Sequence, residues 1–402
     1  MSADLASSPV FEADAASKCL AERAESVPWY IWAGALAVTS ASIGGQWDVS
    51  WHRSIGRDTF WTPAHMAIYA CGVIAAIVGL YLVLTATFGR SAYAARLRAA
   101  SVEVFGLHAP LGVFVAGWGG VAMLTSAPFD NWWHNAYGLD VKIISPPHAL
   151  LILGIRAIDV GMMLLILAAM NRAADAGDAN FKTLRGLVLW LGGLMLSGQM
   201  FFIMEYTWDV MLHRVIAYLC LAAAVPLVMA MISQASRFRW AATTISTIYV
   251  VSLIAFILIL PLFPAQPKLG PVFYPVTHFV PPKFPILLIA PAVALDLFWQ
   301  RARNWKLWQI ALVSGVIFVA AIFAVEWPFA KFLMSHASEN RFFGSIYFDY
   351  NSRPLGPDRL RIFFHPDSGL MLWWGLLRAS LYAAISTWLG LLFGRWMRGV
   401  QR

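Results

Sequence analysis

Asp48, His52 and His65 have side chains that bind metal ions, and their spacing could bring them together. Asp48 and His52 are four residues apart, which places them on one face of a helix, one turn apart. His65 follows Thr62-Pro63, an N-cap residue and a proline at the first helical position, which together signal the start of the next helix. We therefore expect one carboxylate and two imidazoles to meet where one helix ends and the next begins. Three such ligands leave a coordination position open.

The same pattern recurs further along the chain, with the start signal Ser-Pro-Pro before the last histidine. Its members are Asp130, His134 and His148. The two histidines of a copy are separated by 13 positions in the first copy and by 14 in the second. A structural histidine would explain one isolated copy, but two copies favour metal binding. Asp209 and His213 form a third candidate site, and this site is weaker because no Pro-x-His follows it.

Other charged residues near these patterns are candidates for supporting roles. Asp58 and Asp140 each follow the first histidine of their copy by six residues, and they could orient a ligand histidine or carry protons. Arg57 could neutralise Asp58. Arg156 and Asp159 lie three apart within an apolar segment, where charge is costly. They either form an ion pair that fixes helix packing, or they support the ligands of the second site or carry protons.

The composition is that of an integral membrane protein, because 60% of the 402 residues are hydrophobic and only 12% are charged. We predict an all-α bundle of about ten transmembrane helices, using about 20 apolar residues for each span. The predicted spans are residues 29–47, 65–88, 108–129, 148–170, 184–206, 215–233, 240–263, 284–299, 305–327 and 370–393. The three cysteines are far apart, so we expect neither a disulfide framework nor a thiolate metal site.

Three regions follow from this division. Residues 1–28 are a polar tail, residues 29–175 carry both metal-site repeats, and residues 176–402 form a second helical region with an outer loop at 326–369. Arginine and lysine gather in alternate loops and at the C-terminus, which predicts that both termini are cytoplasmic in a bacterial inner membrane. The metal sites then face the periplasm. The basic residues sort by membrane side, so the net charge of +8 does not indicate nucleic-acid binding.

The stretch DVSWHRSIGRDTFWTPAH closely resembles the metal-site segment of an all-helical membrane subunit of the copper membrane monooxygenases, the particulate methane and ammonia monooxygenases. In that family the segment has Asp-x3-His-x12-His, with Trp before the first histidine, then Arg-Asp-Thr and Thr-Pro-x-His. The second family site reads Asn-x3-His-x13-His, and here Asp130 replaces the asparagine. The resemblance covers about residues 30–170. In the C-terminal half, the stretch VFYPVTHFVPPKFPILLIAPAVALD is a more remote resemblance to the other all-helical subunit of the same family.

The resemblance implies an enzyme that inserts oxygen from dioxygen into a C–H or N–H bond of a small apolar or uncharged substrate, such as a hydrocarbon or ammonia. It implies copper at both sites, electrons from a quinol, and a trimer in the lipid bilayer. A separate chain would supply the cupredoxin-like domains. The catalytic and copper-binding residues would be Asp48, His52, His65, Asp130, His134 and His148.

Two alternatives remain open. The protein could bind or transfer copper in the membrane without oxygenase activity, but neither site segment contains the Cys or Met expected of a relay. Alternatively, the metal could be iron or zinc, because two histidines and one carboxylate also form the facial triad of non-haem iron oxygenases.

Overall fold

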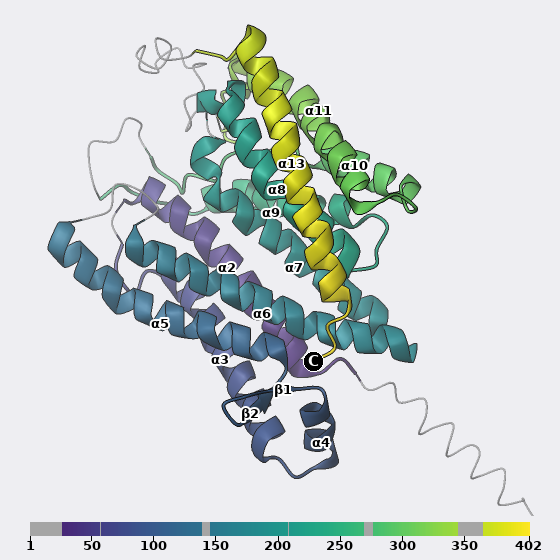
Figure 1. Ribbon diagram of the computed structural model, residues 1–402. Helices are drawn as coiled ribbons and strands as arrows, with labels where there is room; N and C mark the ends of the chain where they lie inside the picture. The colour runs from purple at the N-terminus through teal and green to yellow at the C-terminus, as the bar shows by residue number, and fades with distance from the viewer. Residues whose placement is uncertain (1–25, 57, 139–144, 208, 269–275, 345–364) are drawn as a thin grey trace, which may run out of the picture.

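Helices form nearly all of the regular structure in the computed structural model, which describes residues 26–56, 58–138, 145–207, 209–268, 276–344 and 365–402. Eight helices within these ranges are long and apolar enough to cross a membrane. They lie side by side in a bundle (Figure 1), and this confirms the prediction of an all-α, multi-pass membrane protein.

The described elements are, in chain order, mainly helices. The helices are α2 (Trp29–Ser54), α3 (Pro63–Phe88), α4 (Ala92–Ala99), α5 (Leu111–Tyr137), α6 (Pro146–Ala176), α7 (Phe181–Phe202), α8 (Val215–Ala235), α9 (Ala241–Ile259), α10 (Ile289–Arg301), α11 (Leu307–Leu333) and α13 (Gly369–Arg398). The short strands β1 (Val102–Val104) and β2 (Leu107–Ala109) form an antiparallel hairpin. Short 3-10 helices cover Met204–Tyr206, Asp209–His213, Leu260–Leu262 and His336–Ser338.

Two of the ten predicted spans are not among the eight membrane-length apolar helices. The helix α2 has 26 residues but ends in a polar segment, and α10 has only 13 residues. The helix that was predicted to begin at residue 284 begins at Ile289. Pro285 disfavours a helical conformation at residue 284. The predicted loop at 326–369 also begins too early, since α11 continues through Pro328 to Leu333. The structure therefore places Glu326 inside a helix.

The helices α5 and α6 approach each other closely along a stripe of glycines. A Cβ atom on Gly119 would lie 2.5 Å from the carbonyl oxygen of Gly154, and one on Gly112 would lie closer still to that of Gly161. Small residues at membrane helix interfaces let backbones come this close. The two helices of this hairpin are therefore held at a fixed separation, which also fixes the position of the residues where α5 ends and α6 begins.

The end of α2 is held by a segment from the C-terminal half of the chain. The Ser50 hydroxyl donates a hydrogen bond to the Val280 carbonyl at 2.6 Å, and the Val280 N–H donates to the Ser54 hydroxyl at 2.7 Å. The Lys268 N–H also donates to the Ile55 carbonyl at 2.8 Å. The last two turns of α2, which carry Asp48 and His52, are thus tied to residues far away in the sequence.

Candidate metal centres

The first centre forms where α2 ends and α3 begins. His65 Nε2 lies 3.1 Å from Asp48 Oδ1, and His52 Nε2 lies 3.7 Å from Asp48 Oδ2. One ligand atom from each residue lies within 4.8 Å of the others. Two ligands about 2.1 Å from an ion and about 90–110° apart are separated by about 3.0–3.4 Å. The three side chains are therefore spaced as metal ligands.

Asp58 joins this cluster from the connection between the two helices. Its Oδ2 atom lies 3.3 Å from His65 Nε2 and 3.5 Å from His52 Nε2. The sequence assigned Asp58 only a supporting role, whereas the structure places its carboxylate against both imidazoles. The first centre therefore gathers two imidazoles and two carboxylates.

The orientation of His65 is set by a backbone carbonyl. Its Nδ1 atom lies 2.9 Å from the Thr59 carbonyl oxygen, which accepts a hydrogen bond only if Nδ1 carries the proton. In the neutral ring, Nε2 then presents its lone pair to the carboxylate. Asp48 Oδ1 is buried and accepts no hydrogen bond within the described residues. A cation between these two acceptors would satisfy both, so the donor set fits a metal ion.

The second centre repeats this arrangement where α5 ends and α6 begins. His134 Nε2 and His148 Nε2 each lie 3.4 Å from a carboxylate oxygen of Asp130. The Nδ1 atom of His134 lies 3.1 Å from the Gly138 carbonyl oxygen, which directs Nε2 toward the carboxylate. Asp130 Oδ1 is again buried and accepts no hydrogen bond in the described part of the chain. In both centres the buried aspartate oxygen thus has an imidazole Nε2 as its neighbour, at 3.1 Å in the first and 3.4 Å in the second.

Prolines start both of the helices that deliver the last histidine. The helix α3 begins at Pro63 and α6 at Pro146, as predicted. The Ser145 hydroxyl accepts a hydrogen bond from the His148 N–H at 3.5 Å. The Thr62 hydroxyl does not cap α3, because it instead accepts from the Thr59 N–H at 2.8 Å. This bond shapes the turn whose carbonyl orients His65.

The two centres lie on the same side of the bundle. Figure 1 shows α2 and α5 ending, and α6 starting, on that side. The Tyr69 phenol lies within electrostatic range of Asp48 and Asp58 in the first centre and of Asp130 in the second. Its ring also packs against Phe60, with the ring centroids 5.0 Å apart. No sequence pattern pointed to Tyr69, because its place depends on the packing of α3.

Several predicted residues lie outside the described part of the structure: Arg57, Asp140 and the side chain of Asp209. His213 of the third candidate site is buried, and its ring meets that of Trp327 edge-on at 4.7 Å. Burial and the nearby Lys331 charge lower the pKa of His213 to about 4. His213 is therefore neutral at physiological pH and lies in an aromatic environment.

Arg156 and Asp159 pair with each other, with Arg156 Nη1 3.1 Å from Asp159 Oδ2. Arg156 also donates to the Met195 carbonyl at 3.2 Å and lies over the Phe202 ring. These contacts join α6 to α7, as expected of an ion pair that fixes helix packing. The pair lines a cavity between α2, α6 and α7 that includes none of the six predicted ligands.

No protein-family model, curated protein or solved structure matches this chain. The resemblance to the copper membrane monooxygenases therefore depends on the residues of the two metal-binding patterns.

Proposed function

We propose that this chain is a copper-dependent membrane monooxygenase, which oxidises a small apolar or uncharged substrate of the hydrocarbon or ammonia type with dioxygen. One observation carries the proposal. In each of two centres, two imidazole Nε2 atoms converge on one aspartate that has a buried oxygen without a hydrogen bond in the described part of the chain.

Copper is the metal that the donor set favours most. Imidazole nitrogen suits copper, and mixed nitrogen and oxygen sites bind Cu²⁺ more tightly than the other divalent ions of the first row. When bound, copper would supply the redox chemistry that activates dioxygen. Three protein ligands per centre leave a position for dioxygen or water.

The residues of this chain would position the metal and limit access to it. The Thr59 and Gly138 carbonyls fix the tautomer of one imidazole in each centre, so that Nε2 remains free to bind. Around the second centre, Phe129 stacks on Trp132 with the ring centroids 6.0 Å apart. Trp132 and Tyr137 are more than half exposed, as is usual for aromatic residues at a membrane interface. A small apolar substrate could reach this surface through the lipid.

The charge distribution supports an orientation with both centres on the periplasmic side of a bacterial inner membrane. The helix α3 carries His65 in its first turn and is followed by Arg90, and α6 runs from His148 toward Arg172. Basic residues prefer the cytoplasmic side. In this proposal a quinol donates electrons, the enzyme also needs a separate cupredoxin-like chain, and the protein forms trimers.

A copper-binding or copper-transferring protein without oxygenase activity is the second candidate function. One observation favours it: the His52 side chain is 46% exposed, so the first centre is open to exchange with solvent. Iron and zinc are also compatible with two imidazoles and carboxylates.

The experiment is to purify the protein in lipid nanodiscs and measure bound metals by mass spectrometry, with electron paramagnetic resonance on the same sample. We expect two coppers per chain. His65→Ala should remove copper from the first centre and His148→Ala from the second, while the helix content stays unchanged. His336→Ala is the matched control, because this histidine is largely exposed, pairs with Glu339 and belongs to neither centre.

The metal content separates the candidates. Copper in both centres, followed by oxidation of a hydrocarbon or ammonia in the presence of a reduced quinol, would support the enzyme. Copper that transfers to an acceptor protein without substrate oxidation would support the second function. Full metal content in both histidine variants would refute the two centres.

A further inference from the structure

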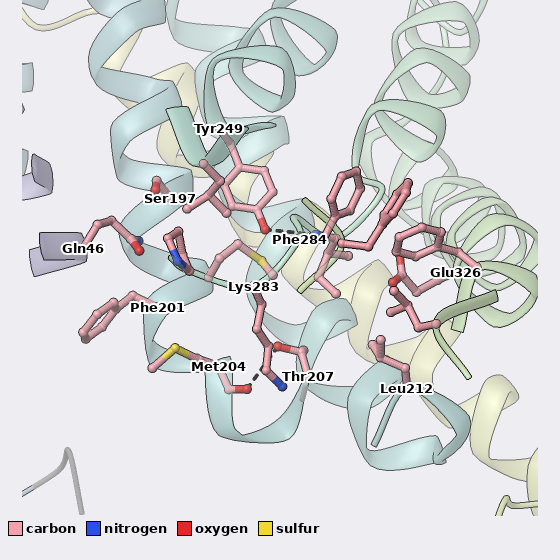
Figure 2. Close-up of a pocket in the computed structure, with 17 residues that line it drawn as sticks. Gln46, Ser197, Phe201, Met204, Thr207, Leu212, Tyr249, Lys283, Phe284 and Glu326 are labelled. Atoms are coloured by element: carbon pink, nitrogen blue, oxygen red, sulfur yellow. Dashed lines mark hydrogen bonds between the residues drawn. The ribbon is translucent and has the colours of Figure 1, made fainter. Parts of the chain in front are cut away.

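Two cavities lie inside the bundle, apart from the metal centres. The first, of about 90 Å³, lies between α2, α7, α9 and α11, and Figure 2 shows Glu326 on the side of it opposite Gln46 and Phe201. The second, of about 80 Å³, lies between α2, α6 and α7 and contains the Arg156–Asp159 pair. Neither cavity is lined by a predicted metal ligand.

The two cavities share a wall. Gln46, Ser197 and Phe201 line both of them, so the two spaces adjoin at these side chains. Gln46 and Ser197 are polar and could hydrogen-bond water on either side. The cavities are therefore neighbouring parts of one internal space.

Each cavity contains a buried carboxylate with one unsatisfied oxygen. In the first, Glu326 is 1% exposed, and its Oε2 accepts from the Leu287 N–H at 3.0 Å, whereas Oε1 has no hydrogen bond among the described residues. In the second, Asp159 is also buried, and its Oδ1 is likewise without a hydrogen bond in the described part of the chain. An orphaned oxygen of this kind costs several kcal/mol unless water reaches it.

Water fits both spaces. A water molecule needs about 10–15 Å³ of such volume and two to four polar partners. The cavities exceed that volume several-fold. The polar groups that line the first cavity with Glu326 are Gln46, Ser197, Thr207 and the Tyr249 hydroxyl, which accepts from the Ile286 N–H at 3.2 Å and keeps its own proton to donate. The Lys283 side chain also lines this cavity.

We propose that the two cavities form a water-filled path that carries protons between Glu326 and the Arg156–Asp159 pair inside the membrane. Charged residues within membrane helices commonly mark such relays. In each transfer, the O–H bond of one carboxylic acid breaks as an O–H bond forms on the adjacent water. That water passes another proton onward, and the last one protonates the second carboxylate. No electron moves, and the path uses neither metal centre.

The first cavity extends toward one side of the bundle. The first cavity reaches Thr207, beyond the end of α7, on the side where α6 begins and both metal centres lie. Beyond Asp159, in contrast, the next turns of α6 are buried and apolar from Met162 to Ala168. In this proposal protons enter from the side of the metal centres and reach Asp159, and these turns of α6 offer no polar group beyond it.

Infrared spectroscopy in nanodiscs tests the path through the exchange of the carboxyl protons with D₂O. The bands of Glu326 and Asp159 are assigned from Glu326→Gln and Asp159→Asn and followed over about pH 4 to 9, the range that carboxyls reach in proteins. We expect both carboxyls to titrate and to exchange within minutes. Asp296 is the reference, because it is buried, lines neither cavity, and accepts hydrogen bonds from the Ala242 and Thr243 N–H groups.

A plug in the shared wall gives the sharper result. Ser197→Leu should slow exchange at Asp159 at least tenfold, while Glu326, in the first cavity, stays fast. Gly45→Leu is a second plug, placed in the second cavity beside this wall, where a Cβ meets no atom within 4 Å. Ser252→Leu on α9, which lies outside both cavities, should change nothing. Exchange at Asp159 as slow as at Asp296, an Asp159 that does not titrate, or rapid exchange in both plugged variants would overturn the proposal.

Discussion

Replacing Asp58 with asparagine should weaken metal binding at the first centre and leave the second unchanged. Asp58→Asn keeps the shape of the side chain and removes one negative charge. In the wild-type protein that charge lies 3.3 Å from one imidazole Nε2 and 3.5 Å from the other. A divalent ion between those nitrogen atoms would therefore have the Asp58 carboxylate as a close neighbour.

The magnitude follows from Coulomb's law. A unit charge about 4 Å from a divalent ion contributes about 2 kcal/mol when the surroundings screen as water does. Such screening is appropriate because the Asp58 side chain is 27% exposed and His52 is more exposed still. A loss of about 2 kcal/mol corresponds to about 30-fold weaker binding. Losing a partner that only orients a ligand typically costs about 10–100-fold, a similar loss.

The assay measures the metal affinity of the protein in nanodiscs by competition with a chelator of known affinity. The His148→Ala variant reports the affinity of the first centre, and the His65→Ala variant reports that of the second. Asp178→Asn, a carboxylate in the connection between α6 and α7, is the control and should leave both affinities unchanged. First-centre affinity within about threefold of wild type in Asp58→Asn, well short of the expected loss, would refute the inference that this carboxylate belongs to the centre. An equal loss at both centres would indicate a general effect on the fold.

Three further predictions test the supporting structure. Gly119→Ala should destabilise the protein by about 1–3 kcal/mol and reduce metal in the second centre only, because its Cβ would lie 2.5 Å from the Gly154 carbonyl oxygen. Gly120→Ala on the same helix meets nothing within 4 Å and should be silent in the same thermal unfolding and metal assays. The pKa of His213 is lowered from 6.5 to about 4 in the folded protein, so between these pH values the unfolded chain binds more protons than the folded chain. Stability should thus fall by up to about 3 kcal/mol as pH drops from about 6.5 to about 4, and His213→Gln should lose that part of the pH dependence in unfolding measurements. Metal occupancy of both centres should also fall as pH drops below about 6, since an imidazole must lose its proton to bind a metal. Rebinding of the metal on return to neutral pH would show that the loss was not caused by unfolding.

Local sequence signals predicted the parts of the centres that depend on local structure. The spacing of Asp48 and His52 fixes their common helical face, and Pro63 fixes where the next helix begins. The same signals apply to Asp130, His134 and the helix start at Pro146. Hydrophobic segment lengths likewise predicted the all-α membrane fold, because about 20 apolar residues are needed to cross the bilayer.

Features that depend on tertiary contacts could not be predicted from the sequence patterns. The Thr59 carbonyl that orients His65 belongs to a turn shaped by the Thr62 hydroxyl, which the sequence suggested would cap the helix instead. Glu326 was predicted at the start of the outer loop, yet α11 continues through Pro328 to Leu333. Its position opposite Gln46 in the first cavity results from the packing of helices distant in sequence.

The two centres depend on different parts of the chain, so they should respond separately to perturbation. The ligand-bearing end of α2 is tied through Ser50 and Ser54 to Val280, in the C-terminal half of the chain. The second centre instead depends on the glycine contacts within its own hairpin of α5 and α6. A change that breaks the hydrogen bonds to Val280 should therefore reduce metal binding at the first centre before it reduces binding at the second. By this argument, residues 176–402 are needed to position the first centre even though they supply none of its predicted ligands.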